Sequence, residues 1–114
     1  MGKYVSYYAY GKLAEARSFM AMSSKPLRER VARAYLAWIF IVREDDLADE
    51  MKMDFALLKS MVTEKPPSHW RGAVEATLAD MHWRKVNKCA ELIVTMADRA
   101  DHLIDPKFDY RSAA

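Results

Sequence analysis

The stretch of sequence that decides the fold runs from Val31 to Val42 and reads V-A-R-A-Y-L-A-W-I-F-I-V. After Arg33 it contains nine apolar residues in a row, Ala34 to Val42. Such a run covers the whole circumference of a helix, and a helix that is apolar on all sides is expected to be buried on all sides. The run is much shorter than the ~20 residues of a membrane span. We therefore predict a central apolar helix over about 26–43, on which the other elements pack.

Length and composition predict one globular domain. The chain has 114 residues, of which 52% are hydrophobic, enough for a core without disulfides or a structural metal. Its single cysteine, Cys89, cannot form an intramolecular disulfide, which favours a reducing, cytoplasmic location. The first residues do not have the pattern of a signal peptide. Gly2 and Ser6 match the loose myristoylation pattern, which matters only in a cell that carries the transferase.

Two further helices are predicted from apolar residues at helical spacing. The first covers about 4–22; a strand is the alternative there, but it lacks a partner strand. The second covers about 46–63, has Asp45 or Asp46 as its N-cap, and ends before Pro66-Pro67. The expected buried stripes are Val5, Tyr8, Leu13, Ala16 and Met20 in the first helix, and Leu47, Met51, Phe55, Leu58 and Val62 in the second.

The region 68–104 has helical periodicity and no proline. One helix of this length would span about 55 Å and protrude from a small domain. We therefore expect a break near Met81–Arg84, with Asp80 as the cap of the next helix; one long helix in a dimer is the alternative. Asp105-Pro106 ends the last helix and leaves 105–114 as a C-terminal tail. The predicted fold is an all-α, compact antiparallel bundle of four to five helices in a single domain, 1–114.

Charge is distributed in alternating blocks, although the net charge is only +2. Residues 1–43 carry eight Lys/Arg and two Glu, and residues 44–64 carry two Lys and seven Asp/Glu. Residues 65–89 are again basic and residues 90–114 are again acidic. Antiparallel neighbours can use such blocks to complement each other, and solvated charged surfaces explain most of them.

Three segments resemble a group of small bacterial all-helical proteins with no assigned activity. They read R-E-R-V-A-R-A-Y, E-D-D-L-A-D-E-M-K-M-D-F-A-L-L and G-A-V-E-A-T-L-A-D-M, and the resemblance covers roughly residues 26–98. It consists of helix and cap patterns, implies a bacterial cytoplasmic origin and a turn after Met81, and supplies no function. Where polar, turn-forming residues are expected after Met81, this chain has His82-Trp83-Arg84.

Two constellations are compared with catalytic or metal-binding sites. Asp45-Asp46-Leu47-Ala48-Asp49 matches D-D-x-x-D, which prenyl-transferring enzymes use for Mg²⁺, but those enzymes need a large cavity and a second acidic cluster. Cys89 and His82 are seven residues apart, about 10 Å along a continuous helix, which is too far for a nucleophile–base pair. We predict a core cysteine, helix-capping aspartates, and neither catalysis, a cofactor nor a metal.

The remaining candidates are interaction surfaces. His82-Trp83-Arg84-Lys85-Val86-Asn87-Lys88 combines basic groups with an aromatic ring, and Lys25, Arg28, Arg30 and Arg33 are candidates for the same basic surface. Three Trp, six Tyr and eight Met exceed what a small bundle readily buries, so a self-association surface is expected, with Trp70 and Trp83 as first candidates. We predict a homodimer that acts through protein–protein contacts. The alternative is a small nucleic-acid-binding regulator that uses Trp83, Arg84, Lys85 and Lys88.

Overall fold

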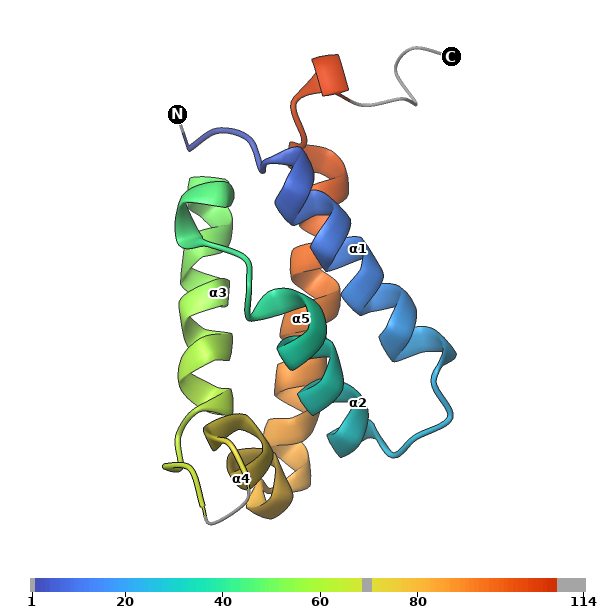
Figure 1. The fold of residues 1–114 in the computed structure, drawn as a ribbon. Helices are drawn as coiled ribbons and strands as arrows, with labels where there is room; N and C mark the ends of the chain where they lie inside the picture. The colour runs from blue at the N-terminus through green and yellow to red at the C-terminus, as the bar shows by residue number, and fades with distance from the viewer. Residues whose placement is uncertain (1, 69–70, 109–114) are drawn as a thin grey trace.

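Five α-helices make up most of the chain in the computed structural model, which describes residues 2–68 and 71–108 (Figure 1). They are α1 (Tyr7–Met22), α2 (Leu27–Ala34), α3 (Asp49–Val62), α4 (Ala73–Asp80) and α5 (Trp83–Leu103). A π-helical turn, η1 (Tyr35–Ile39), continues α2, and short 3₁₀ turns lie at η2 (Glu44–Asp46) and η3 (Pro106–Phe108). The only β pairing among the described residues is two isolated bridges. The all-α prediction is confirmed.

The long elements alternate in direction along the bundle. In Figure 1, α1 and α3 run one way, while α2 with η1, and α5, run the other way; α4 closes one end. Helix α5 contacts α1, α2 and α3, and buries seven side chains, namely Val86, Cys89, Leu92, Ile93, Met96, Ala97 and Ala100. The antiparallel bundle is therefore as predicted, and α5 has the most extensive contacts with the other helices.

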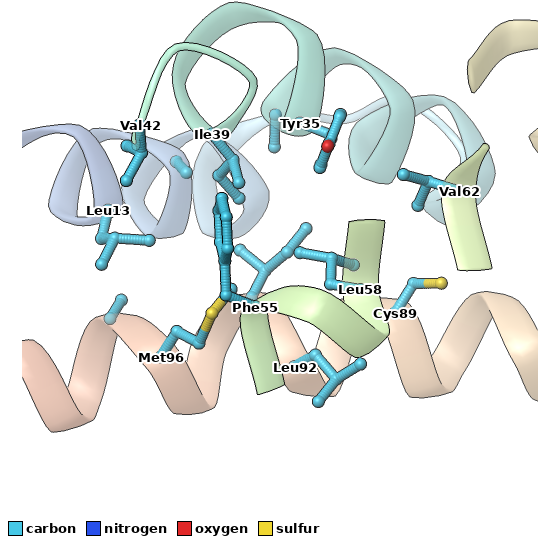
Figure 2. Close-up of a cluster of buried hydrophobic side chains, with 14 of the residues drawn as sticks. Leu13, Tyr35, Ile39, Val42, Phe55, Leu58, Val62, Cys89, Leu92 and Met96 are labelled. Carbon is cyan, nitrogen blue, oxygen red and sulfur yellow. The ribbon is translucent and has the colours of Figure 1, made fainter. Parts of the chain in front are cut away.

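The segment 27–43 packs on α1, α4 and α5 but is buried only on its inner side. Its buried residues are Val31, Ala34, Tyr35, Ile39 and Val42. Figure 2 shows Ile39 next to the ring of Phe55, with Val42 and Tyr35 on either side of Ile39. The prediction that this stretch is buried on all sides is wrong, because Leu36, Phe40 and Ile41 are exposed.

A π turn explains which residues of this segment face inward. The Phe40 amide donates to the Tyr35 carbonyl at 2.8 Å, a five-residue spacing that widens the helix locally. With this register Ile39 is fully buried, whereas Trp38 is only partly buried, against Phe19.

The N-terminal residues form an extended arm before α1, which starts at Tyr7 rather than Tyr4. The Ser6 side chain caps α1 by accepting from the Ala9 amide at 3.0 Å. The Val5 amide donates to the Leu103 carbonyl at 2.9 Å, and the Ser6 amide donates to the Asp46 carbonyl at 2.8 Å. The arm thereby provides a hydrogen-bond donor for the carbonyl of Leu103, the last residue of α5. The expected burial of Tyr8 is wrong, since Ala9 faces the core instead.

Helix α3 begins later than predicted and without an aspartate cap. Its N-cap is Ala48, and the free amide of Asp49 donates to the Gly2 carbonyl at 2.6 Å. The Asp46 carboxylate instead accepts from the Arg43 amide at 3.3 Å and closes η2. The predicted caps at Asp45 and Asp46 are therefore wrong, because the N-terminal arm supplies the acceptor.

The predicted break after Met81 is confirmed, and the single long helix is excluded: α4 ends at Asp80 and α5 begins at Trp83. The predicted cap is wrong. His82 is the N-cap of α5, and its Nδ1 accepts from the Arg84 amide at 3.1 Å, while Asp80 pairs with Lys65 at 2.6 Å.

Helix α5 ends ahead of Asp105-Pro106, as predicted; residues 109–114 of the expected tail lie outside the described residues. No helix in the described part of the chain combines the length and apolarity needed to cross a membrane.

Candidate interaction surface

Several large apolar side chains are exposed on the outer side of the segment 36–41. Leu36, Phe40 and Ile41 are 40%, 63% and 44% exposed, and Ala37 beside them is exposed as well. We call these four residues the outer apolar surface. They are exposed because the π turn directs Tyr35 and Ile39 inward, which leaves the intervening apolar side chains in solvent.

A shallow apolar hollow lies beside this surface, between α1 and η1. It has a volume of about 450 Å³ and contains Phe19, Met22 and Trp38 among its lining residues. The rings of Phe19 and Trp38 are 5.4 Å apart, and Met22 is 85% exposed. Exposed apolar side chains that gather in one place mark a contact surface more often than isolated ones do.

The two ends of the same segment carry opposite charges. Arg33 is exposed one turn before Leu36, and Glu44 and Asp45 are exposed shortly after Ile41. Among the described residues, the Arg33 and Glu44 side chains make no hydrogen bond or ion pair. Arg33 lines a groove of about 600 Å³ between α2 and α4 together with Arg28, Arg71, Glu29 and Glu75.

The basic segment 82–88 lies at the start of α5, far along the chain from the outer apolar surface. Trp83 is 58% exposed, stacks on His82 with ring centroids 5.7 Å apart, and has the Arg84 guanidinium 5.3 Å from its ring centroid. Lys85 pairs with Glu64 at 3.6 Å, and Lys88 pairs with Glu91 at 3.4 Å. Trp70, the other tryptophan predicted for a contact surface, lies outside the described residues.

Two of the three arginines of α2, Arg28 and Arg30, have backbone partners of their own. Arg28 donates to the carbonyls of Leu78 and Met81 at the end of α4, the second at 2.5 Å. Arg30 donates at 2.8 Å to the carbonyls of Lys25 and Met20, after and within α1. Both guanidinium groups therefore bind backbone carbonyls in or near the last turns of α4 and α1.

Cys89 has the environment of a core residue. It is fully buried, and its Sγ lies 3.9 Å from the Met81 sulfur. Burial raises the pKa of the Cys89 thiol to about 11, which opposes the thiolate form that nucleophiles need.

Two of the carboxylates at 45–49 have local partners. Asp46 closes η2, and Asp49 pairs with Lys52 at 3.0 Å. No group of three or more His, Cys, Asp or Glu placed to hold a metal ion occurs in the described residues.

Sequence reasoning identified the apolar run but missed the outer apolar surface. The available signal was the length of the run: one buried stripe needs about every third or fourth residue, so nine consecutive apolar residues exceed it. Comparison with protein-family models, curated proteins and solved structures found no match. The resemblance to small bacterial proteins stays a prediction.

Proposed function

We propose that the protein acts through protein–protein contacts rather than catalysis, and that it forms a homodimer through the outer apolar surface. The observation that carries this proposal is the exposure of Leu36, Phe40 and Ile41 within an uninterrupted apolar run. A monomer gains nothing from three large apolar side chains in water, whereas burying each against a partner contributes roughly 1–2 kcal/mol. Two-fold dimers are the commonest arrangement of homo-oligomers.

The hollow beside the surface enlarges the area available to a partner. A stable interface removes about 800 Å² of surface from each subunit. The outer apolar surface alone is a narrow strip, and Met22, Trp38 and Phe19 extend it toward α1. Aromatic and methionine side chains are enriched in such interfaces.

Sedimentation velocity tests the proposal. We expect the parent protein to sediment as a dimer and Phe40→Ser to sediment as a monomer with an unchanged circular dichroism spectrum, because Phe40 is outside the core. Met53→Ser is the matched control, since Met53 is 82% exposed on α3 and outside the proposed surface. A parent that remains monomeric at tens of micromolar, about the range of weak specific dimers, contradicts the proposal.

A second candidate function is nucleic-acid binding by the start of α5. Exposed Trp83 with Arg84 against its ring is the observation that favours it, because bases stack on exposed aromatic rings and phosphates pair with guanidinium groups. Lys85 and Lys88 are already paired with glutamates, which weakens their attraction for phosphate. Binding to single-stranded or duplex DNA that falls steeply with salt supports this function, and no binding at low salt excludes it.

The proposed location is the cytoplasm of a bacterium. The support is the single cysteine, which is buried and free in the structure, and the resemblance of residues 26–98 to small bacterial proteins. Expression with an epitope tag in a bacterium, followed by fractionation, tests the location.

A further inference from the structure

We propose that His82 is a pH-sensitive cap, which fixes the first turn of α5 while its imidazole is neutral and releases that turn when the imidazole is protonated. The device lies at the junction between α4 and α5. It involves no residue of the outer apolar surface, so it is independent of the proposed dimer.

The hydrogen bond from the Arg84 amide defines the protonation state of the cap. A backbone amide is a donor, so the Nδ1 of His82, 3.1 Å away, has to be the acceptor. A ring nitrogen that accepts has no proton, and the neutral ring then has its proton on Nε2. A protonated imidazole has donors at both nitrogens. Protonation therefore turns the capping acceptor into a second donor that faces the Arg84 amide.

The first turn of α5 depends on His82 through its backbone as well. The His82 carbonyl accepts from the amides of Lys85 at 2.9 Å and Val86 at 3.1 Å. Two residues, Met81 and His82, separate the end of α4 from the start of α5. Losing the imidazole acceptor therefore loosens the turn at the point where the chain changes direction between the two helices.

Charged side chains from three segments surround the cap. Glu64, Lys65, Asp80 and Lys85 line a cavity of about 320 Å³ together with His82. They form two ion pairs, Lys65–Asp80 at 2.6 Å and Lys85–Glu64 at 3.6 Å. Each of the two carboxylates thus already has a lysine as its partner, which limits how strongly it attracts a proton to the imidazole.

Two guanidinium groups lie beside the cap as well. The Arg84 guanidinium is 5.3 Å from the centroid of the Trp83 ring, on which His82 stacks. Arg28 of α2 donates at 2.5 Å to the carbonyl of Met81, the residue before His82. An indole ring attracts a cation, but Arg84 already occupies this one. Both groups and the positive end of the α5 dipole oppose a further positive charge on His82.

The direction of the pH effect follows from these contacts. The capped turn requires a neutral His82, whereas a frayed turn leaves the imidazole free to bind a proton, so the frayed state binds more protons. The stability of the turn therefore rises with pH. Histidine changes its charge between about pH 5 and pH 8, so the turn is expected to be weakened at the lower value and closed at the higher one. Trp83 and Arg84, which are exposed in this turn, lose their fixed position in acid.

Urea unfolding of the full chain at about pH 8 and about pH 5 tests the cap. His82→Asn is the matched variant, because asparagine caps helix starts and keeps its acceptor at both pH values. We expect the unfolding equilibrium constant of the parent, relative to that of His82→Asn, to rise roughly fivefold from the higher to the lower pH as one capping bond is lost. The two proteins share every other titrating group, so the effects of those groups cancel in this ratio.

His102→Asn is the control for histidine titration elsewhere on α5. His102 lies in the last turn of α5, where a positive charge is favourable, so acid should not destabilise the parent relative to this variant. NMR provides the local measurement: the Arg84 amide resonance should shift with pH in the parent and stay constant in His82→Asn. A ratio to His82→Asn that is equal at both pH values overturns the proposal. A changed ratio with an unaffected Arg84 amide overturns it too, because the proton then acts at another place than the cap.

Discussion

His82 resolves a mismatch between the chain and the local pattern expected of a helix start. Ser, Thr, Asp and Asn are the usual N-caps because their short side chains reach the free amides of the first turn. Here the imidazole Nδ1 accepts from the Arg84 amide at 3.1 Å, and the ring also stacks on Trp83. A histidine therefore supplies the polar, turn-forming group expected after Met81.

Replacing the His82 cap is expected to lower the stability of the protein. His82→Ala leaves the Arg84 amide without its acceptor and is expected to lower the free energy of unfolding by about 1 kcal/mol. His82→Asp supplies a carboxylate at the positive end of α5 and is expected to keep or exceed parental stability. Urea unfolding measures both. If His82→Ala and His82→Asp lower the free energy of unfolding equally, the stabilising contact is that of the imidazole ring and not the capping hydrogen bond.

The folded protein is expected to lose stability at alkaline pH because the thiol of Cys89 is buried. Burial raises the pKa of this thiol from 9.0 to about 11. Between these values the unfolded thiol loses its proton while the folded one keeps it, so the unfolded state binds fewer protons and stability falls as pH rises. The full effect is about 2–3 kcal/mol. Burial also raises the pKa of Tyr35, which adds to the loss.

Comparison with Cys89→Ala isolates the thiol. The variant loses packing at every pH, but its stability should fall less steeply than that of the parent between about pH 8 and pH 11. Parallel pH profiles for the two proteins contradict the assignment of the effect to Cys89.

At the scale of elements, the π turn gives a prediction about register. Ile39 is fully buried, so Ile39→Ala is expected to cost about 2–5 kcal/mol. Trp38 packs on Phe19 along the margin of the core, so Trp38→Ala is expected to cost less, roughly 1–3 kcal/mol, although it removes more atoms. Chemical denaturation of both variants at one protein concentration ranks them. If Trp38→Ala is more destabilising than Ile39→Ala, Trp38 lies in the core and the helical register of this segment differs from that of the structure.

Element existence follows from sequence more readily than element ends. The break after Met81 is predictable because an uninterrupted helix over 68–104 would outgrow the domain. The starts of α1 and α3 depend instead on the N-terminal arm, whose Gly2 carbonyl and Val5 and Ser6 amides bond residues far away in the chain. Periodicity within a window contains no information about these partners, so Asp45 and Asp46 looked like caps without being caps.

The candidate site was harder to predict than the fold for a related reason. A run of apolar residues is equally consistent with a helix buried all round and with one whose outer side meets a second molecule. Only the packing of α1, α4 and α5 against the inner side of 27–43 shows that Leu36, Phe40 and Ile41 are left over. Trp83, in contrast, was predicted as a contact residue from its neighbours in the sequence alone. It is exposed in the structure, so it stays a candidate for a contact.

At the scale of the whole molecule, the alternating charge blocks act between helices. Arg17 of α1 pairs with Asp98 at 2.8 Å and Asp101 at 2.9 Å on α5, and the hydrogen bond that Arg17 donates to Asp101 is the main cause that raises the pKa of Arg17. Glu64 after α3 pairs with Lys85 on α5. These exposed pairs orient neighbours more than they stabilise them.

A dimer held together by the outer apolar surface makes stability depend on protein concentration. Dimerisation stabilises the folded state by mass action, so the parent Tm should rise by several degrees over about a hundredfold increase in concentration. Phe40→Ser removes the central contact, and its Tm should stay constant over the same range. Because Phe40 is 63% exposed in the single chain, the variant monomer should match the parent at the lowest concentration. Differential scanning calorimetry across the range separates the contributions: a difference at every concentration indicates damage to the fold, whereas curves that meet on dilution indicate loss of the partner.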